Sequence, residues 1–183
     1  MILLVDNGSL KTPKIKEIIE KYTSVKTIFY KELNTIKFTL FKGVILSGAP
    51  ILLSKEENKI HINYFTVLKK IKIPILGICF GHQILSLLFG GEVYIQNEDR
   101  NLNEIQKLTS SPLLEGFGEK FFMQEDHCEW TSLPNDFILL ANSGNCTNEA
   151  MQHKFLPFYG VQFHPEVSGE LGEKLIDNFI KQC

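Results

Sequence analysis

The stretch Pro74–Gln83 places a cysteine between an apolar run and an amphipathic one, and it constrains the fold more than any other part of the chain. The residues up to Ile78 are the β-branched and large apolar types expected of a strand buried on both faces. From Ile84 onward, apolar residues recur at helical spacing. The pattern predicts a strand, a sharp turn at Cys79 and a helix, which is the cysteine counterpart of a nucleophile elbow. Glycines on both sides would relieve the crowding of such a turn.

A second stretch, Tyr159–Val167, reads as a strand whose polar tail holds His164 and Glu166 on either side of a proline. Proline biases the residue before it toward an extended conformation, so these two side chains are expected to project to the same side. Each residue alone has a structural explanation, since cysteine packs as a small hydrophobe and a histidine at a strand end is often only packed. Their joint occurrence with Cys79 instead favours a nucleophile, a base and an orienting acid.

The first half of the chain alternates between strands and helices in the order β-α-β-β-α-β-α. The strands are expected at 2–5, 25–30, 43–46 and 75–78, and the helices at 13–22, at 55–70 and after the Cys79 turn. This order implies a mostly parallel, twisted central sheet flanked by helices, a flavodoxin-like α/β fold with right-handed crossovers. In such sheets the working site lies at the carboxyl ends of the strands.

After Gly90 the pattern changes to shorter strand-like pieces, separated by turn signals such as that at 111–112. These pieces are expected at 92–95, 105–108, 120–124, 137–142 and 158–163. We expect them to add a mixed or antiparallel strand region, and a helix over 169–181 to close the fold. The 183 residues suit a single domain that spans 1–183.

Composition narrows the classes of protein. The hydrophobic content of 44% is ordinary for a soluble protein, and no apolar run approaches the roughly 20 residues that span a bilayer. The apolar start lacks a basic leader, so a cytoplasmic location without membrane contact is expected. Arg100 is the only arginine in a chain of net charge −2, which argues against a nucleic-acid surface. The four cysteines show no regular spacing, so neither a metal site nor a disulfide framework is predicted.

The segments Gly77–Gln83 and Gly160–Glu166 together resemble the signature pair of the class I glutamine amidotransferases, the triad-type glutaminase domains. Two separate motifs agree in chain order and in spacing. The resemblance extends along nearly the whole chain and includes 4–8, 45–50 and 148–153. Within this family, the last of these segments, the short domain and Gln162–Val167 are most similar to the glutaminases that form a separate subunit of GMP synthases.

By this resemblance, Cys79 attacks the side-chain carboxamide of glutamine, His164 passes the thiol proton to the departing ammonia, and Glu166 orients His164. Water then hydrolyses the glutamyl thioester to glutamate. The developing negative charge needs prearranged donors. The resemblance implies that the backbone amides of Phe80 and of the Gly48–Ala49 loop provide them.

Gln83 lies one helical turn after Cys79 and would line the glutamine pocket, although a polar residue at a helix start is often only solvated. Two departures from the family pattern bear on this pocket. Ala49 replaces the second glycine of the loop, which would cost roughly 1 kcal/mol or more if that position needed a positive φ. In 124–130 the histidine usual in the family is displaced by one position and extra acids are present, so His127 and Trp130 could be functional or merely packed.

The chain contains neither a Ser-Gly-Gly-x-Asp-Ser pyrophosphatase loop nor a Walker-type phosphate loop. The resemblance therefore implies a partner, an ATP-pyrophosphatase synthetase subunit that binds ATP and Mg²⁺, with no cofactor in this chain. Ammonia would pass to that subunit for synthesis of GMP from XMP. Three alternatives stay open: another amidation pathway, a free-standing hydrolase of γ-glutamyl compounds, and a degenerate domain that binds without turnover.

Overall fold

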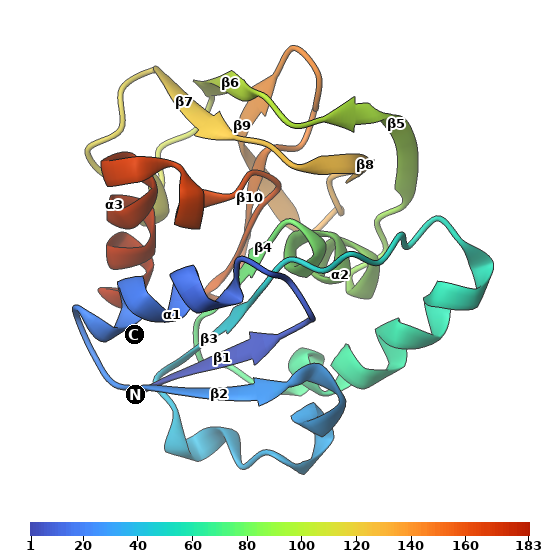
Figure 1. Ribbon diagram of the computed structural model, residues 1–183, viewed down its shortest axis with the longest axis vertical. Coiled ribbons are helices and arrows are strands. Elements are labelled where there is room, and N and C mark those ends of the chain that lie inside the picture. Colours follow the sequence, from blue (N-terminus) through green and yellow to red (C-terminus); the bar gives the residue numbers. More distant parts are fainter.

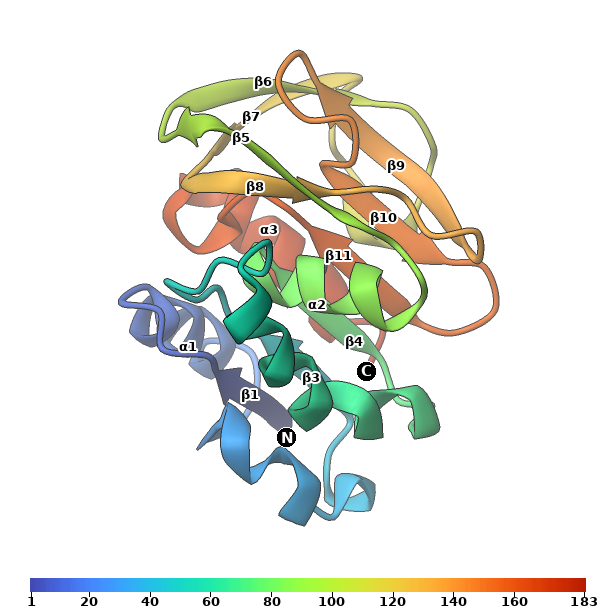
Figure 2. The same cartoon turned by 90° about the vertical axis from the view of Figure 1, so that its right-hand side faces the viewer.

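A twisted nine-stranded sheet runs through the protein, with helices on both faces (Figures 1 and 2). The computed structural model describes the backbone of residues 1–183 and the side chains of all of these except residue 56. The strands of this sheet, in spatial order, are β2 (Val25–Phe29), β1 (Ile2–Asp6), β3 (Gly43–Leu46), β4 (Ile75–Ile78), β11 (Phe158–Val161), β10 (Ala150–His153), β9 (Phe137–Ser143), β6 (Leu102–Lys107) and β7 (Lys120–Gln124). A separate antiparallel ribbon pairs β5 (Val93–Asp99) with β8 (His127–Thr131).

The sheet changes character at β11. From β2 to β11 all pairings are parallel, whereas those from β11 through β10, β9 and β6 to β7 are antiparallel. The predicted α/β fold, with a mostly parallel sheet and an added antiparallel region, is therefore confirmed. β4 lies between β3 and β11, so the loops after these three strands meet at one edge of the sheet.

Alternation along the buried strands divides the core into two layers. In β1, Ile2 and Leu4 pack in one layer with α1 (Thr12–Glu20) and α3 (Gly169–Ile180). Leu3 and Val5 pack in the other, with α2 (Phe80–Leu88) and the helix Glu56–Lys70. Figure 2 shows α2 and that helix in front of the sheet, and α3 behind it. Both faces of the parallel strands are thus covered, which explains their continuous apolar sequences.

Two expectations about the elements need correction. The segment predicted as a crossover helix over 55–70 is helical, but Glu56–Lys70 has the tighter 3₁₀ form. Asparagines and β-branched residues weaken its preference for an α-helix, and the Asn58 and Thr66 side chains bond to backbone carbonyls. Strands β8 and β10 were not predicted, because the first is rich in polar residues and the second is short.

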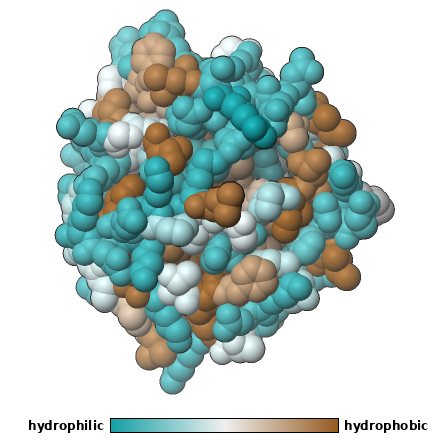
Figure 3. Space-filling view, in the orientation of Figure 1, coloured by the Kyte–Doolittle hydropathy of each residue, from teal (hydrophilic) through white to brown (hydrophobic). Residues whose placement is uncertain are grey.

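No helix in the described part of the chain is both long and apolar enough to cross a membrane. On the face seen in Figure 3, hydrophobic side chains are scattered among hydrophilic ones and do not form one continuous patch.

The close packing of β4 against α2 gives a prediction about stability. A Cβ at Gly77 would lie 2.4 Å from the carbonyl oxygen of Gly81 and 2.7 Å from the nitrogen of His82. Backbone atoms cannot move aside cheaply, so Gly77→Ala should lower the free energy of unfolding by about 1–3 kcal/mol. Gly144→Ala is the matched control, since a Cβ there meets nothing within 4 Å. Urea denaturation of both variants measures the difference, and equal stabilities would contradict this account.

Candidate active site

Cys79 occupies the sharp turn between β4 and α2. Its φ of 50° and ψ of −104° make it the one non-glycine residue with a positive φ in the described chain. Its backbone N–H donates to Val161 O at 2.8 Å, and its carbonyl accepts from Gln83 N at 3.0 Å. A non-glycine residue in such a conformation costs on the order of 1–3 kcal/mol and persists only where its surroundings impose it. The predicted elbow is therefore present, and it presents the thiol at the sheet edge.

His164 and Glu166 follow β11, the strand beside β4. His164 Nδ1 lies 2.7 Å from Glu166 Oε1, and both side chains are almost completely buried. The expected extended tail is wrong in detail, because Pro165–Val167 forms a short 3₁₀ turn directly after His164. The turn brings the carboxylate back toward the ring, so the two groups meet by a different route.

The electrostatics of His164 favour its protonated form. Burial alone would lower its pKa, but the adjacent Cys79 thiolate and the hydrogen-bonded Glu166 raise the pKa of His164 to about 10. Its protonated form therefore stabilises the folded state fully below about pH 6.5, and that contribution is lost as the pH rises toward 10. A buried imidazolium beside a thiolate is suited to nucleophilic attack on a carbonyl carbon.

The loop after β3 approaches this pair closely. A Cβ at Gly48 would lie 3.1 Å from His164 Cε1 and 3.8 Å from Cys79 Cβ. Asn7 holds the loop from the β1 side: its N–H donates to Ser47 Oγ at 2.9 Å and its side-chain amide donates to Ser47 O at 2.7 Å. Ala49 has no positive φ, so replacement of the glycine carries no backbone cost there.

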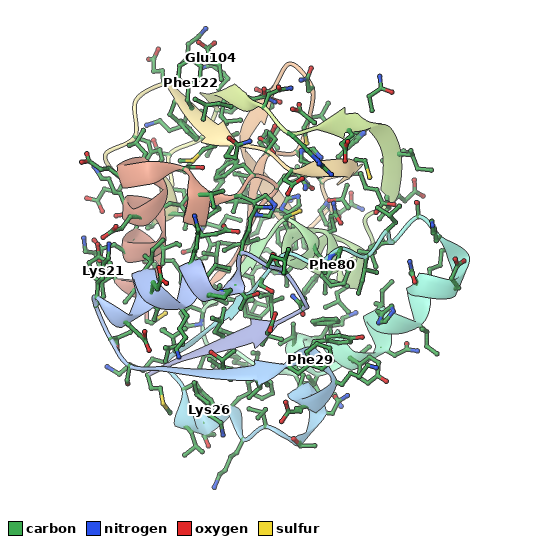
Figure 4. The ribbon with its side chains drawn as sticks, in the orientation of Figure 1. Lys21, Lys26, Phe29, Phe80, Glu104 and Phe122 are labelled. Carbon is green, nitrogen blue, oxygen red and sulfur yellow. The ribbon has the colours of Figure 1, made fainter. Side chains whose placement is uncertain are left out.

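Phe80 begins α2, directly after the cysteine. Backbone N–H groups in the first turn of a helix lack intrahelical partners, which leaves the Phe80 amide available at the elbow. The Phe80 ring is buried and packs edge-on against Phe65 at a centroid distance of 6.1 Å. Figure 4 shows it near the middle of the molecule, where it anchors the start of the helix.

Gln83 lies beside the pocket but is braced by neighbours. Its Nε2 donates to Glu129 O at 3.1 Å and to Gln162 Oε1 at 3.2 Å. Gln162 in turn directs its Nε2 at Cys79 Sγ, at 3.6 Å. Gln162 was missed by the sequence analysis, although its position two residues before His164 on a strand places it on the same side.

Glu129 is a second residue that the sequence did not reveal. Its buried carboxylate accepts hydrogen bonds from Leu53 N at 2.8 Å, from Ser54 N at 3.0 Å and from the Ser54 hydroxyl. These bonds fix the segment that follows the Gly48–Ala49 loop. No local pattern signals such a contact, because Leu53 and Ser54 are 76 and 75 positions away from Glu129 in the chain.

A pocket of about 500 Å³ opens above Cys79, a size suited to a small molecule. Its floor includes Cys79, His164 and Gln83, and charged side chains line its mouth. Across that mouth Asp126 forms ion pairs with Lys11 and with Arg100, whose Nε lies 3.3 Å from Asp126 Oδ1. Burial would raise the pKa of Asp126, but the bond from Lys11 outweighs it and the pKa is lowered.

His127 lines the same pocket from β8, and neighbouring groups engage its ring. Its Nε2 lies 3.0 Å from Glu125 Oε2, and its Nδ1 lies 3.0 Å from both Glu129 O and Gln96 Nε2. Burial lowers the pKa of His127, so the ring is neutral near pH 7. The packed alternative considered for this residue is therefore the better description.

The fold and this site define a class of protein: an α/β domain with a cysteine on a nucleophile elbow and a histidine–glutamate pair on the neighbouring strand. The sequence profile of the family Glutamine amidotransferase class-I matches residues 3–183. The chain therefore belongs to the class I glutamine amidotransferase family.

Curated relatives match along the full length. The chain is 36% identical to a glutamine-hydrolysing subunit of GMP synthase from Pyrococcus furiosus, with 100% of this chain and 98% of that protein covered. It is 37% identical to the subunit of the same name from Methanocaldococcus jannaschii, with coverage of 100% and 97%. Among solved structures, a Thermoplasma acidophilum protein provisionally described as a GMP synthase subunit superposes with a TM-score of 0.91 at 27% identity. That superposition covers 100% of this chain and 92% of the other.

The charge coupling at the elbow can be measured without any turnover. Cys79→Ala removes the thiolate while the burial of His164 remains, so the pKa of His164 should fall well below that in the wild type. Titration of the imidazole resonances by NMR checks this, and His153, in a separate cluster of aromatic rings, should titrate identically in both proteins. An unchanged His164 titration would refute the coupling.

Proposed function

We propose that this chain is the glutaminase subunit of a two-subunit GMP synthase, and that it hydrolyses glutamine to glutamate and ammonia. One observation carries the proposal: the strained Cys79 lies beside the buried His164–Glu166 pair at the floor of a pocket large enough for a small molecule. The names of the full-length relatives support the choice of glutamine as substrate.

In the proposed mechanism, the Cys79 thiolate attacks the carboxamide carbon of glutamine and forms a carbon–sulfur bond. His164, protonated at the start, gives its proton to the departing nitrogen as the carbon–nitrogen bond breaks. Water then attacks the thioester, His164 takes a proton from that water, and the thiolate leaves. Glu166 holds the ring at Nδ1 throughout and stabilises the imidazolium.

The negative charge on the tetrahedral oxygen would be met by backbone amides. Those of Phe80, at the start of α2, and of Ala49, in the loop held against His164, are the proposed donors. Gly48 contributes by its lack of a side chain, since a Cβ there would press on His164.

The amino-acid end of glutamine carries one positive and one negative charge, and the pocket mouth offers both signs. We place the α-carboxylate near Lys11 and Arg100 and the α-ammonium near Asp126 and Glu98, all of which line the pocket. Gln83 and Gln162 then act from below: they fix the pocket wall and the thiol.

The proposal extends to the organisation of the enzyme. Residues 1–183 would form a single glutaminase domain in the cytoplasm, and ATP with Mg²⁺ would bind on an ATP-pyrophosphatase synthetase subunit. That subunit would receive the ammonia and convert XMP to GMP.

The proposed roles predict an order of defects in glutamine hydrolysis. Cys79→Ala should reduce kcat by about 10⁴-fold or more, and His164→Ala by a similar factor, because nucleophile and base act as a unit. Glu166→Gln should cost less, on the order of 10²–10³-fold, since it orients the base. Cys183→Ala, which changes a cysteine outside the pocket, should hydrolyse glutamine at the wild-type rate. Glutamate release measures all four, and normal turnover by Cys79→Ala would disprove the assignment.

The pathway is tested by mixing the chain with a GMP-forming synthetase subunit from the same genome. We expect glutamine-dependent GMP formation from XMP and ATP, and faster glutamate release in the mixture than from either protein alone. Glutamate release that ignores the partner would identify a free-standing hydrolase, and release without GMP would point to another amidation pathway. No release in any mixture would identify a binding domain without turnover.

A further inference from the structure

Two carboxyl groups, Glu125 and Glu149, are completely buried behind the pocket wall. Glu125 lies between β7 and β8, and Glu149 directly precedes β10. None of their four oxygens receives a well-aligned hydrogen bond from a described donor. The polar groups nearest to them are each other, the Ser143 hydroxyl beside Glu149, and His127 Nε2 at 3.0 Å from Glu125.

Asp99, in the same buried cluster, is treated in the opposite way. Its carboxylate receives hydrogen bonds from Asn101 N and Nδ2 at 3.0 Å, from Asn103 Nδ2 at 2.7 Å and from Asn145 Nδ2 at 2.9 Å. Burial would raise the pKa of Asp99, but these donors lower it. One acid thus has four N–H donors and its two neighbours have none among the described groups, so the fold accommodates Asp99 as an anion and the other two as acids.

We propose that Glu125 and Glu149 keep a shared proton at neutral pH, and that this acid pair positions the β7–β8 turn against β10 behind the pocket. The inference rests on the proposed glutaminase function only for its activity measurements. A shared proton supplies the missing donor, since the protonated carboxyl of one residue donates to the carboxylate oxygen of the other. Both are positioning residues, because neither lines the pocket.

The ionisation equilibria agree with this geometry. Burial raises the pKa of Glu125 to about 8 and that of Glu149 to about 8, and in Glu149 the charge of the other acid adds to the shift. Two carboxylates in one dry site cannot both ionise easily, because each charge lacks water and repels the other. The described side chains of the cluster are also not arranged to hold a metal ion that would neutralise them.

The pair is linked to the active site through backbone contacts on both sides. On one side, the carbonyl of Gln124, the residue before Glu125, accepts from His164 N at 2.8 Å. The carbonyl of the next residue, Asp126, lies 4.0 Å from Cys79 Sγ. On the other side, the carbonyl of Glu149 accepts from Gln162 N at 2.8 Å. A shift of either acid would therefore be felt at the thiol and at the imidazole.

Other titratable groups face the pair from four elements, and each affects its proton. They are His127 from β8, Asp99 from β5, Cys146 from the loop before β10, and His164 from the end of β11. His127 is neutral, and burial raises the pKa of Cys146, so neither competes for the proton near pH 7. The charge of Asp99 opposes a second anion, whereas that of His164 favours it.

Loss of the shared proton would place two anions in the wall together with Asp99. Their repulsion is expected to loosen the β7–β8 turn, so wild-type kcat/KM should fall above about pH 8, before His164 itself deprotonates. The folded protein also holds protons that the unfolded chain releases, so the free energy of unfolding should fall as the pH rises from 4.5 to about 8.

The decisive experiment detects the proton directly. Infrared spectra of the full chain should show the C=O stretching band of a buried carboxylic acid at pH 7, and the band should disappear on alkalinisation. Glu125→Gln/Glu149→Gln should lack this band. Trp130, the only tryptophan, lies in β8, and its fluorescence should change at the same pH in the wild type but not in Glu149→Gln. These measurements need no turnover, so they stand even if the chain is not a glutaminase.

Activity then separates positioning from simple structural support. Glu149→Gln keeps a donor for Glu125, so its kcat/KM should stay nearly constant between pH 7 and 9, where that of the wild type falls by roughly tenfold. Glu149→Ala, which has no donor, should lose activity at both values. Asp99→Asn is the matched control: it removes an anion that four donors need, so it should lower stability and leave the infrared band in place.

Absence of the infrared band in folded wild-type protein at pH 7 would overturn the proposal, and so would its persistence in the double variant. A Glu149→Gln enzyme with the wild-type alkaline fall would overturn the positioning role.

Discussion

The close approach of β4 to the start of α2 is the constraint on which the site depends. Gly77 and Gly81 let the two backbones meet without a side chain between them, and the turn thereby forces Cys79 into a positive φ. Because β4 is hydrogen-bonded to β3 on one side and to β11 on the other, the loop at Gly48 and the ring of His164 reach the thiol from opposite directions. Local backbone strain is thus supported by the most regular part of the sheet.

Much of this arrangement could be predicted from the sequence, because it leaves local patterns. Buried parallel strands are continuously apolar, and both chemical motifs stand directly after such strands, so Cys79, His164 and Glu166 were found together. The antiparallel region was predicted only in outline, since strands such as β8 mix polar and apolar residues. Gln162 and Glu129 were missed because they act through partners distant in sequence. In the sequence Glu125 and Glu149 look like ordinary surface acids, and only the fold shows that both are fully buried.

The described acids of the pocket region illustrate how the same functional group is given different roles by its donors. Glu166 faces an imidazole, Glu129 caps backbone and hydroxyl donors, and Asp126 faces two cations. Each of these carboxylates is ionised beside a positive charge or several hydrogen-bond donors. Acids without such partners are kept neutral by burial instead. Placement of donors therefore decides which carboxyl group can hold a proton and which can hold a charge.

The ion pairs across the pocket mouth have a consequence for selectivity. Lys11 and Arg100 are already satisfied by Asp126, so the charges at the entrance balance one another before any ligand binds. A ligand that bears only an amide would have to compete with those pairs and would offer nothing in exchange. A zwitterion can replace them charge for charge, because it brings an anion for the two cations and a cation for the carboxylate. Discrimination between free glutamine and other carboxamides would then be exerted at the rim, well away from the bond that is broken.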